Sequence, residues 1–243
     1  IYGALTLVVK GGARNTQIYN NIVHLTSSSA VAFYLGGCTG QSWFWDPSEP
    51  YESYNTAVYN NVVFNDNGST GNIVARFRSA AEGSFFNNVA FNAQALDFMI
   101  SSPGACATTP TSNRNPTIVN NIFVDQPGGN SYSMGSISTY SGTRTINYND
   151  FYGYSSPISQ THAIIGDPLF VNEASDWHLQ AGSPAIGSGT TVAMTGYAGE
   201  VLVTNKDRNG ILRTTPWDLG IYATNGVAGD LTPPAAPTNV RIQ

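Results

Sequence analysis

The residues best suited to chemistry are a few cations on apolar segments of a chain with few charges. Lys10 ends the apolar stretch LTLVV (5–9), and Arg76 and Arg78 lie in NIVARFR (72–78). A neutral lysine can abstract a proton, and an arginine can pair with a carboxylate. Such groups would act together only if the fold brings them to one surface, so the elements that position them come next.

The chain contains five copies of an internal repeat. Four copies share an apolar segment centred on an Asn-Asn pair, and TINYNDFYG (145–153) is a degenerate fifth. The four are QIYNNIVHL (17–25), AVYNNVVFN (57–65), SFFNNVAFN (84–92) and TIVNNIFVD (117–125). Another apolar segment precedes each pair, so the copies begin at residues 4, 30, 72, 95 and about 132. Two short strands and an Asn-centred turn in each copy, without a helical period, indicate either an antiparallel sandwich or a parallel solenoid.

The asparagines favour the solenoid. Asn tolerates the left-handed backbone conformation and can hydrogen-bond to its copies in the coils above and below, which only a solenoid places in register. We therefore expect an all-β fold, a right-handed single-stranded parallel β-helix. Its turn asparagines, which we interpret as structural rather than ligand-binding, should stack at one turn: Asn21, Asn61, Asn88 and Asn121.

Alternation along the first strand of each copy predicts which side chains face outward. One set of alternating positions is apolar throughout and should face the core. The other set contains Lys10, Tyr34, Arg76, Arg78 and Asp97, which we expect on one outer face. Neighbouring strands lie about 4.8 Å apart, so the backbones of Lys10 and Arg78, two coils apart, should be about 10 Å apart. The alternative is a solvated sheet face on which Arg76 pairs with Asp97.

Two long loops should stand beside this face. The loop 38–55 contains Trp43, Trp45 and Tyr51, and the loop 103–116 leaves from the same corner. Aromatic faces beside charged groups suit sugar rings, so these three residues, with Asp97 of the outer face, are candidates for substrate binding. The alternative is that some of the aromatic residues form a satellite core that pins the loop to the helix.

The same loops carry the candidate metal ligands and both cysteines. Carboxylates on a loop suit a hard cation, so Asp46, Glu49 and Glu52 are candidate calcium ligands, although their spacing matches no specific motif. Cys38 and Cys106, near the starts of the two loops, permit one disulfide. The three histidines lack metal-ligand spacing, and no other cofactor is indicated.

Composition limits the partners. The 10 Lys and Arg residues against 15 Asp and Glu residues give a net charge of −5, which argues against nucleic-acid binding. No apolar run is long enough to span a membrane. Few charges and many Gly, Asn, Ser, Thr and Tyr residues are typical of an extracellular all-β protein, and we expect a secreted monomer.

The repeated pattern of short strands and Asn-centred turns changes near residue 163. We expect one β-helix domain over 1–223, made of coils (1–162) and a C-terminal cap (163–223) that covers the open core. The stretch 224–243 has the composition of a Pro-rich linker that leads into a fibronectin type III domain. We therefore expect further domains in the same chain, and further coils before residue 1.

The final segment carries a family resemblance. It contains DPLFVN (167–172), DWHLQAGSPAIG (176–187), DRNG (207–210) and DLGIYA (218–223), and this ending resembles that of bacterial secreted right-handed parallel β-helix proteins. With the strands and Asn turns, the resemblance covers residues 1–223. Among relatives of known activity, the chain looks most like polysaccharide lyases of the chondroitinase B and alginate lyase type. This implies β-elimination in a uronic-acid polymer, with a Lys base, an assisting Arg and often a calcium ion.

The resemblance assigns roles to the outer-face residues. Lys10 would take the C5 proton, Arg78 or Arg76 would assist as the arginine, and Tyr34 would protonate the leaving oxygen. Two alternatives from other classes stay open. A glycoside hydrolase needs two carboxylates about 5–10 Å apart, and a non-catalytic carbohydrate-binding or adhesive module needs none.

Overall fold

The computed structural model describes most of the chain. The described residues are 1–3, 5–39, 42, 44, 46, 50–98, 112–126, 132–137, 140–202 and 205–228. They contain strands, turns and no α-helix, and therefore no helix that could cross a membrane.

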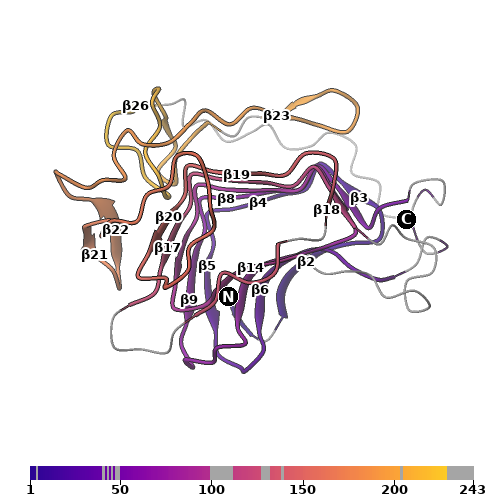
Figure 1. Ribbon diagram of the computed structural model, residues 1–243. Coiled ribbons are helices and arrows are strands. Elements are labelled where there is room, and N and C mark those ends of the chain that lie inside the picture. The colour runs from indigo at the N-terminus through magenta and orange to yellow at the C-terminus, as the bar shows by residue number, and fades with distance from the viewer. Residues whose placement is uncertain are drawn as a thin grey trace.

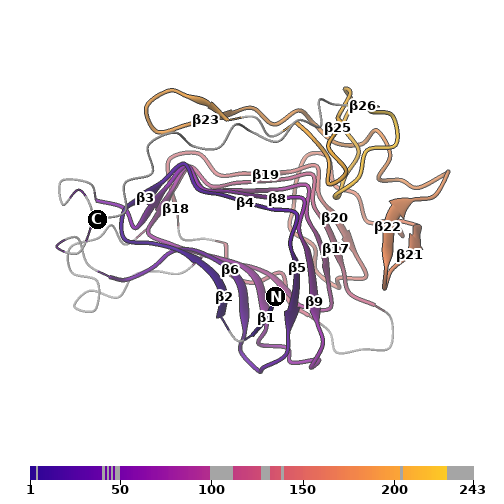
Figure 2. The ribbon, with the colours of Figure 1, turned by 180° about the vertical axis from the view of Figure 1, so that it is seen from behind.

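The chain winds as a right-handed parallel β-helix, as the repeat predicts. Figures 1 and 2 view the coils from their two ends, so that successive coils overlie one another. Each full coil contributes one short strand to each of four parallel sheets, which we call B, C, D and A in chain order. Each coil thus has four strands rather than the expected two: the Asn-Asn pair separates a strand of sheet D from a strand of sheet A, and a two-residue strand of sheet C lies between sheets B and D.

The strands of each sheet recur once per coil. Sheet B contains β2 (Leu5–Val9), β6 (Val31–Gly36), β10 (Ile73–Arg78) and β14 (Gln94–Phe98). Sheet C contains β3 (Ala13–Arg14), β7 (Ser53–Tyr54), β11 (Ala80–Ala81), β15 (Asn113–Arg114) and β18 (Tyr140–Ser141). Sheet D contains β4 (Gln17–Tyr19), β8 (Ala57–Tyr59), β12 (Ser84–Phe86), β16 (Thr117–Val119) and β19 (Thr145–Asn147). Sheet A contains β1 (Tyr2–Gly3), β5 (Ile22–Leu25), β9 (Val62–Asn65), β13 (Val89–Phe91), β17 (Ile122–Val124) and β20 (Asp150–Tyr152).

The predicted asparagine ladder is confirmed between sheets D and A. The side-chain amide of each asparagine donates to the side-chain oxygen of the next at 2.9–3.0 Å, through Asn21, Asn61, Asn88, Asn121 and Asn149. Each amide nitrogen also donates to the carbonyl two residues before its own, as Asn88 Nδ2 does to Phe86 O at 3.0 Å. These bonds satisfy the polar groups of a buried turn, where an unpaired group would cost about 1–3 kcal/mol.

A glutamine ends the ladder. Gln160 accepts hydrogen bonds from both the backbone and the side-chain nitrogen of Asn149, each at 3.1 Å. Tyr154 and Ile158, from the same stretch, join the core cluster of the coils. The residues just after β20 therefore continue the core, within the region expected to hold coils.

The segment 163–223, expected to cover the open core, instead runs mainly along the outer faces of sheets A and D. In Figure 1 it is the orange-to-yellow trace outside the coils. Among the described residues its strands pair antiparallel, β21 (Phe170–Asn172) with β22 (Asp176–Leu179), β23 (Met194–Thr195) with β24 (Val201–Leu202), and β25 (Ile211–Leu212) with β26 (Val227–Ala228), which follows the segment. The stretch expected as a linker from 224 thus contains β26, and residues 229–243 lie outside the described residues.

The interior is apolar and aromatic. Phe33, Phe85, Phe123 and Phe151 are fully buried and contact one another in sequence along the axis, with ring centroids 5.1–6.2 Å apart. The inward positions of sheet B are also buried, as Leu35 and Phe77 show. This continuous core holds the coils in register, and it fixes which side chains of sheet B face outward.

Candidate functional site

Strand register gathers most of the predicted site residues on sheet B. Tyr34 lies beside Val8 on one side and beside Arg76 on the other, and Arg76 lies beside Asp97. Arg78 pairs with Gly36, and Lys10 directly follows β2, whose last residue pairs with the residue before Gly36. The alignment therefore predicts this arrangement correctly: a coil lies between Lys10 and Arg78, and Tyr34 belongs to that middle coil.

The positive charge of Arg76 is balanced by an acidic residue on the same face. Its Nε lies 2.8 Å from Asp97 Oδ2, and the two side chains are 23% and 16% exposed. The guanidinium carbon lies 5.8 Å from the ring centroid of Tyr34, within the range of a cation–π contact. The Arg76–Asp97 ion pair expected in the alternative interpretation is thus formed. The guanidinium of Arg76 is held in place on this face, and its charge is balanced by Asp97.

Lys10 differs from Arg76 because its side chain is exposed. Among the described residues it forms no ion pair. Its stem lies against Gly37, where a side-chain Cβ would be 3.4 Å from both Cβ and Cδ of Lys10 and 3.6 Å from Oε2 of Glu52. The lysine stem and the Glu52 carboxylate therefore flank the same glycine.

Gly36 is required by the approach of the next coil. Its φ is 92°, and a Cβ there would lie 1.9 Å from the carbonyl oxygen of Arg78. That oxygen accepts a hydrogen bond from the backbone N–H of Gly37 at 2.9 Å. The absence of a side chain between Lys10 and Arg78 thus has a backbone cause, since no other residue fits where the chain turns off sheet B.

Glu52 braces the turn that follows Lys10. It is fully buried, and its carboxylate accepts hydrogen bonds from the backbone N–H of Gly11, at 3.1 Å, and from that of Thr39. Its backbone oxygen accepts from Gly12 N at 2.8 Å. Sequence reasoning treats Glu52 as a loop acid, and the signal it misses is that Glu52 directly precedes a strand of sheet C.

The other candidate calcium ligands do not join Glu52 among the described residues. Asp46 Oδ2 lies 3.2 Å from Arg14 Nη2, and Glu49 lies outside the described residues. Within the part of the chain that the structure describes, no three His, Cys, Asp or Glu side chains are close enough to hold a metal ion.

The loop aromatics divide into buried and undescribed residues. Tyr51 is 7% exposed, and its ring contacts that of Tyr54 edge-on at 5.6 Å. The guanidinium of Arg114 lies 4.7 Å from the Tyr51 ring centroid. Tyr51 therefore packs in a satellite cluster and offers a sugar little exposed surface, while Trp43 and Trp45 lie outside the described residues.

Cys38 is disulfide-bonded, and Cys106 also lies outside the described residues.

An outward aromatic column on sheet A is absent from the sequence predictions. Register places Tyr2, His24, Phe64 and Phe91 side by side on successive coils. Their rings stack with centroids 4.7–5.2 Å apart and interplanar angles of 6–19°. The signal is visible in the aligned segments IVHL, VVFN and VAFN, whose third residue is aromatic in each.

No protein-family model and no curated protein matches this chain.

Proposed function

We propose that this protein is a secreted polysaccharide-active β-helix whose sheet B face binds a uronic-acid polymer and cleaves it by β-elimination. The observation that carries the proposal is the register that places Lys10, Tyr34, Arg76 and Arg78 on one outer face of three consecutive coils. Three of the ten basic residues thus lie on this face, and their positive charges attract an anionic polymer.

Each residue has a distinct role in the proposed reaction. Lys10, in its neutral form, removes the proton from C5 of the uronic acid. The C5–H electron pair forms the C4–C5 double bond, and the C4–O bond breaks with its electrons passing to the leaving oxygen. Tyr34, one coil away, donates its phenolic proton to that oxygen, and the lysine proton returns the tyrosine to neutrality through solvent. Arg78, two coils from Lys10, binds the carboxylate of the polymer.

A non-catalytic glycan-binding face is the second candidate. The Arg76–Asp97 ion pair favours it, because it positions Arg76 without adding an acid or base to the face. A glycoside hydrolase needs two carboxylates, and the described residues of this face supply only Asp97, which is paired with Arg76.

The test compares two lysine variants on a panel of polyuronates. Lysines occur only at positions 10 and 206, so Lys206→Ala is the matched control for Lys10→Ala. Formation of the unsaturated product is followed by its ultraviolet absorbance, and binding is measured separately. We expect Lys10→Ala to abolish product formation and to leave the melting temperature nearly unchanged, because an exposed side chain contributes little to stability.

The two candidates give different results. Polyuronate binding by the unchanged protein without any unsaturated product would support the binding module and reject the lyase. Product formation that survives Lys10→Ala would place the base elsewhere. Failure of every polyuronate to bind would reject both candidates.

A further inference from the structure

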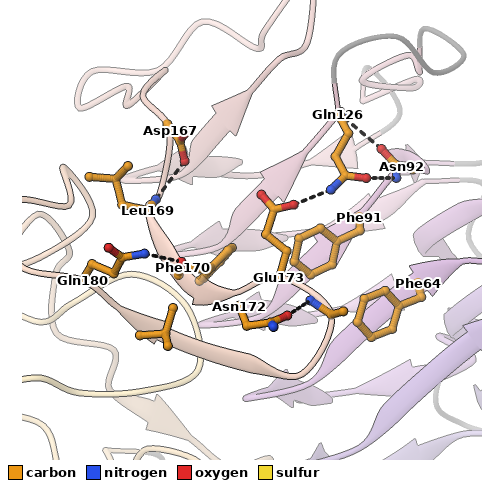
Figure 3. A pocket seen from close by; sticks show the side chains of 12 residues that line it. Phe64, Phe91, Asn92, Gln126, Asp167, Leu169, Phe170, Asn172, Glu173 and Gln180 are labelled. Carbon is orange, nitrogen blue, oxygen red and sulfur yellow. Dashed lines mark hydrogen bonds between the residues drawn. The ribbon is translucent and has the colours of Figure 1, made fainter.

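A second candidate site lies on a different sheet. A cleft of about 610 Å³ opens between the outer side of sheet A and the β21–β22 hairpin with the residues before it (Figure 3). One wall contains Phe64, Phe91, Asn92 and Gln126, and the other is formed by Asp167 and residues 169–174 with Gln180. This volume is within the range of about 300–1,000 Å³ found for small-molecule sites.

The sheet A wall of the cleft is aromatic. Phe64 and Phe91 stack at 5.1 Å with an interplanar angle of 6°, and Trp177 and Phe170 pack against them at 5.9 and 5.8 Å. Because the rings stack along the helix axis, the partly exposed Phe64 turns its edge rather than its face outward, while Phe91 and Phe170 are 3% and 6% exposed. Aromatic edges carry partial positive charge, so they favour contact with ligand oxygen atoms.

The wall of the cleft is held by hydrogen bonds between side chains. Asn92 Nδ2 donates to Gln126 Oε1 at 2.9 Å, and Gln126 N donates to Asn92 Oδ1 at 2.9 Å. Gln126 Nε2 donates to Glu173 of the hairpin, so this amide joins the two walls, as Figure 3 shows. The polar groups of the cleft are therefore pre-positioned, which lowers the entropic cost of binding.

The chemistry of the lining matches hydroxyl groups. Four side-chain amides and two carboxylates line the cleft: Asn92, Gln126, Asn172, Gln180, Asp167 and Glu173. Amides donate and accept, carboxylates accept, and a hydroxyl group can meet either need. The exposed apolar side chains of Leu169 and Val171 on the hairpin can contact the C–H groups of a sugar.

The charge of the cleft is opposite in kind to that of sheet B. Its described lining contains Asp167 and Glu173 and no lysine or arginine. A uronic acid brought here would meet like charges and lose hydration without a cation to compensate. A neutral sugar meets no such penalty.

We propose that this cleft binds a neutral oligosaccharide of about two or three sugar units. This site is separate from the face that carries Lys10, and it does not depend on the activity proposed there. It would give the protein two surfaces that distinguish neutral from anionic glycan segments by charge.

Calorimetric titration with neutral trisaccharides of glucose, xylose and mannose, and with a uronic-acid trisaccharide, tests the proposal. Ala174 lines the cleft and is exposed, so Ala174→Trp should fill the cleft without disturbing the core. Ala198→Trp is the matched control, because Ala198 is an exposed alanine between β23 and β24. Glu173→Ala provides a second variant, which removes the link to Gln126.

We expect at least one neutral trisaccharide to bind, and Ala174→Trp and Glu173→Ala to weaken it at least about tenfold. Ala198→Trp and Lys10→Ala should leave that binding unchanged. The proposal is overturned if no neutral trisaccharide binds, or if Ala174→Trp and Glu173→Ala, both folded by circular dichroism, bind as the unchanged protein does. It is also overturned if only the uronic-acid trisaccharide depends on Ala174 and Glu173.

Discussion

Asn87 and Asn88 are consecutive residues whose side chains bond on opposite sides of the helix wall. Asn88 Nδ2 donates to Asn121 Oδ1 at 3.0 Å within the ladder. Asn87 Nδ2 donates to the carbonyl oxygens of Asp218 and Gly220, at 3.1 and 3.0 Å, in the C-terminal segment. The same division recurs in other copies, where Asn60 bonds to Lys206 O and Asn120 bonds to Thr190 O. One asparagine of each pair therefore stabilises the coils, and the other docks the segment that lies over them.

Asn88→Ala should destabilise the protein strongly. The change removes hydrogen bonds to the carbonyls of Val58 and Phe86, and it leaves unpaired the buried backbone N–H of Asn61, which donates to Asn88 Oδ1 at 3.0 Å. Because each unsatisfied buried group costs about 1–3 kcal/mol, we expect a loss of about 3 kcal/mol or more in the free energy of unfolding. Urea denaturation measures this value.

Asn21→Ala is the control for the ladder. Asn21 lies at the end of the ladder and is only partly buried, so water can replace its lost partners. We expect a loss below about 1 kcal/mol. Equal losses in Asn21→Ala and Asn88→Ala would contradict a stabilising ladder.

Asn87→Gly should loosen the C-terminal segment and leave the coils intact. Asn87 has a φ of 51°, which glycine adopts without strain, so the losses are the two hydrogen bonds to the C-terminal segment and a long one, 3.4 Å, that Asn87 Oδ1 accepts from Asn120 Nδ2. We expect amide hydrogen exchange at Leu219 and Gly220 to become faster, by a factor corresponding to about 1–2 kcal/mol. The amide of Val63, in sheet A, should be unaffected. Uniformly faster exchange at all three amides would instead indicate global destabilisation.

Asp150 should make stability depend on pH. Burial raises the pKa of Asp150 to about 8. The negative charge of Asp167 adds to this rise, and a hydrogen bond from the Gly166 backbone N–H opposes it. The folded carboxyl is thus protonated over a pH range in which the unfolded one, with a pKa near 4, is ionised. The folded state binds more protons there, so stability falls as pH rises from about 4 to about 8, by up to about 1.4 kcal/mol per pH unit.

Replacing the carboxyl by a neutral amide should remove this dependence. Urea denaturation of Asp150→Asn across the same pH range should give a flatter profile than that of the unchanged protein. Asp167→Asn, which alters an exposed carboxylate, should keep most of the slope. An unchanged slope in Asp150→Asn would mean that other groups produce the pH dependence.

The sequence is sufficient to predict the coils, because the asparagine and apolar periods are local signals that repeat. It also predicts that Tyr34, Arg76 and Asp97 are neighbours, since register follows from the same alignment. It marks the second asparagine of each pair for the ladder, but it does not show that the first, whose backbone adopts a positive φ, bonds to the C-terminal segment. The cleft lined by Phe91 and Glu173 could not be predicted from the sequence either, because two segments distant in the sequence meet only after the C-terminal segment docks.

Asp97→Asn should strengthen the binding of anionic polymers to sheet B. Asp97 compensates Arg76 at 2.8 Å, in a position where both side chains are mostly buried. Removing the negative charge frees the guanidinium to attract a polyuronate, and we expect about a three- to tenfold gain in affinity at low salt. The gain should shrink as salt is added, because screening weakens the attraction between charges. Asp167→Asn, on sheet A's side of the molecule, should leave polyuronate affinity unchanged. If Asp97→Asn weakens binding instead, Asp97 serves the ligand by holding Arg76 in place, and the position of the arginine matters more than its charge.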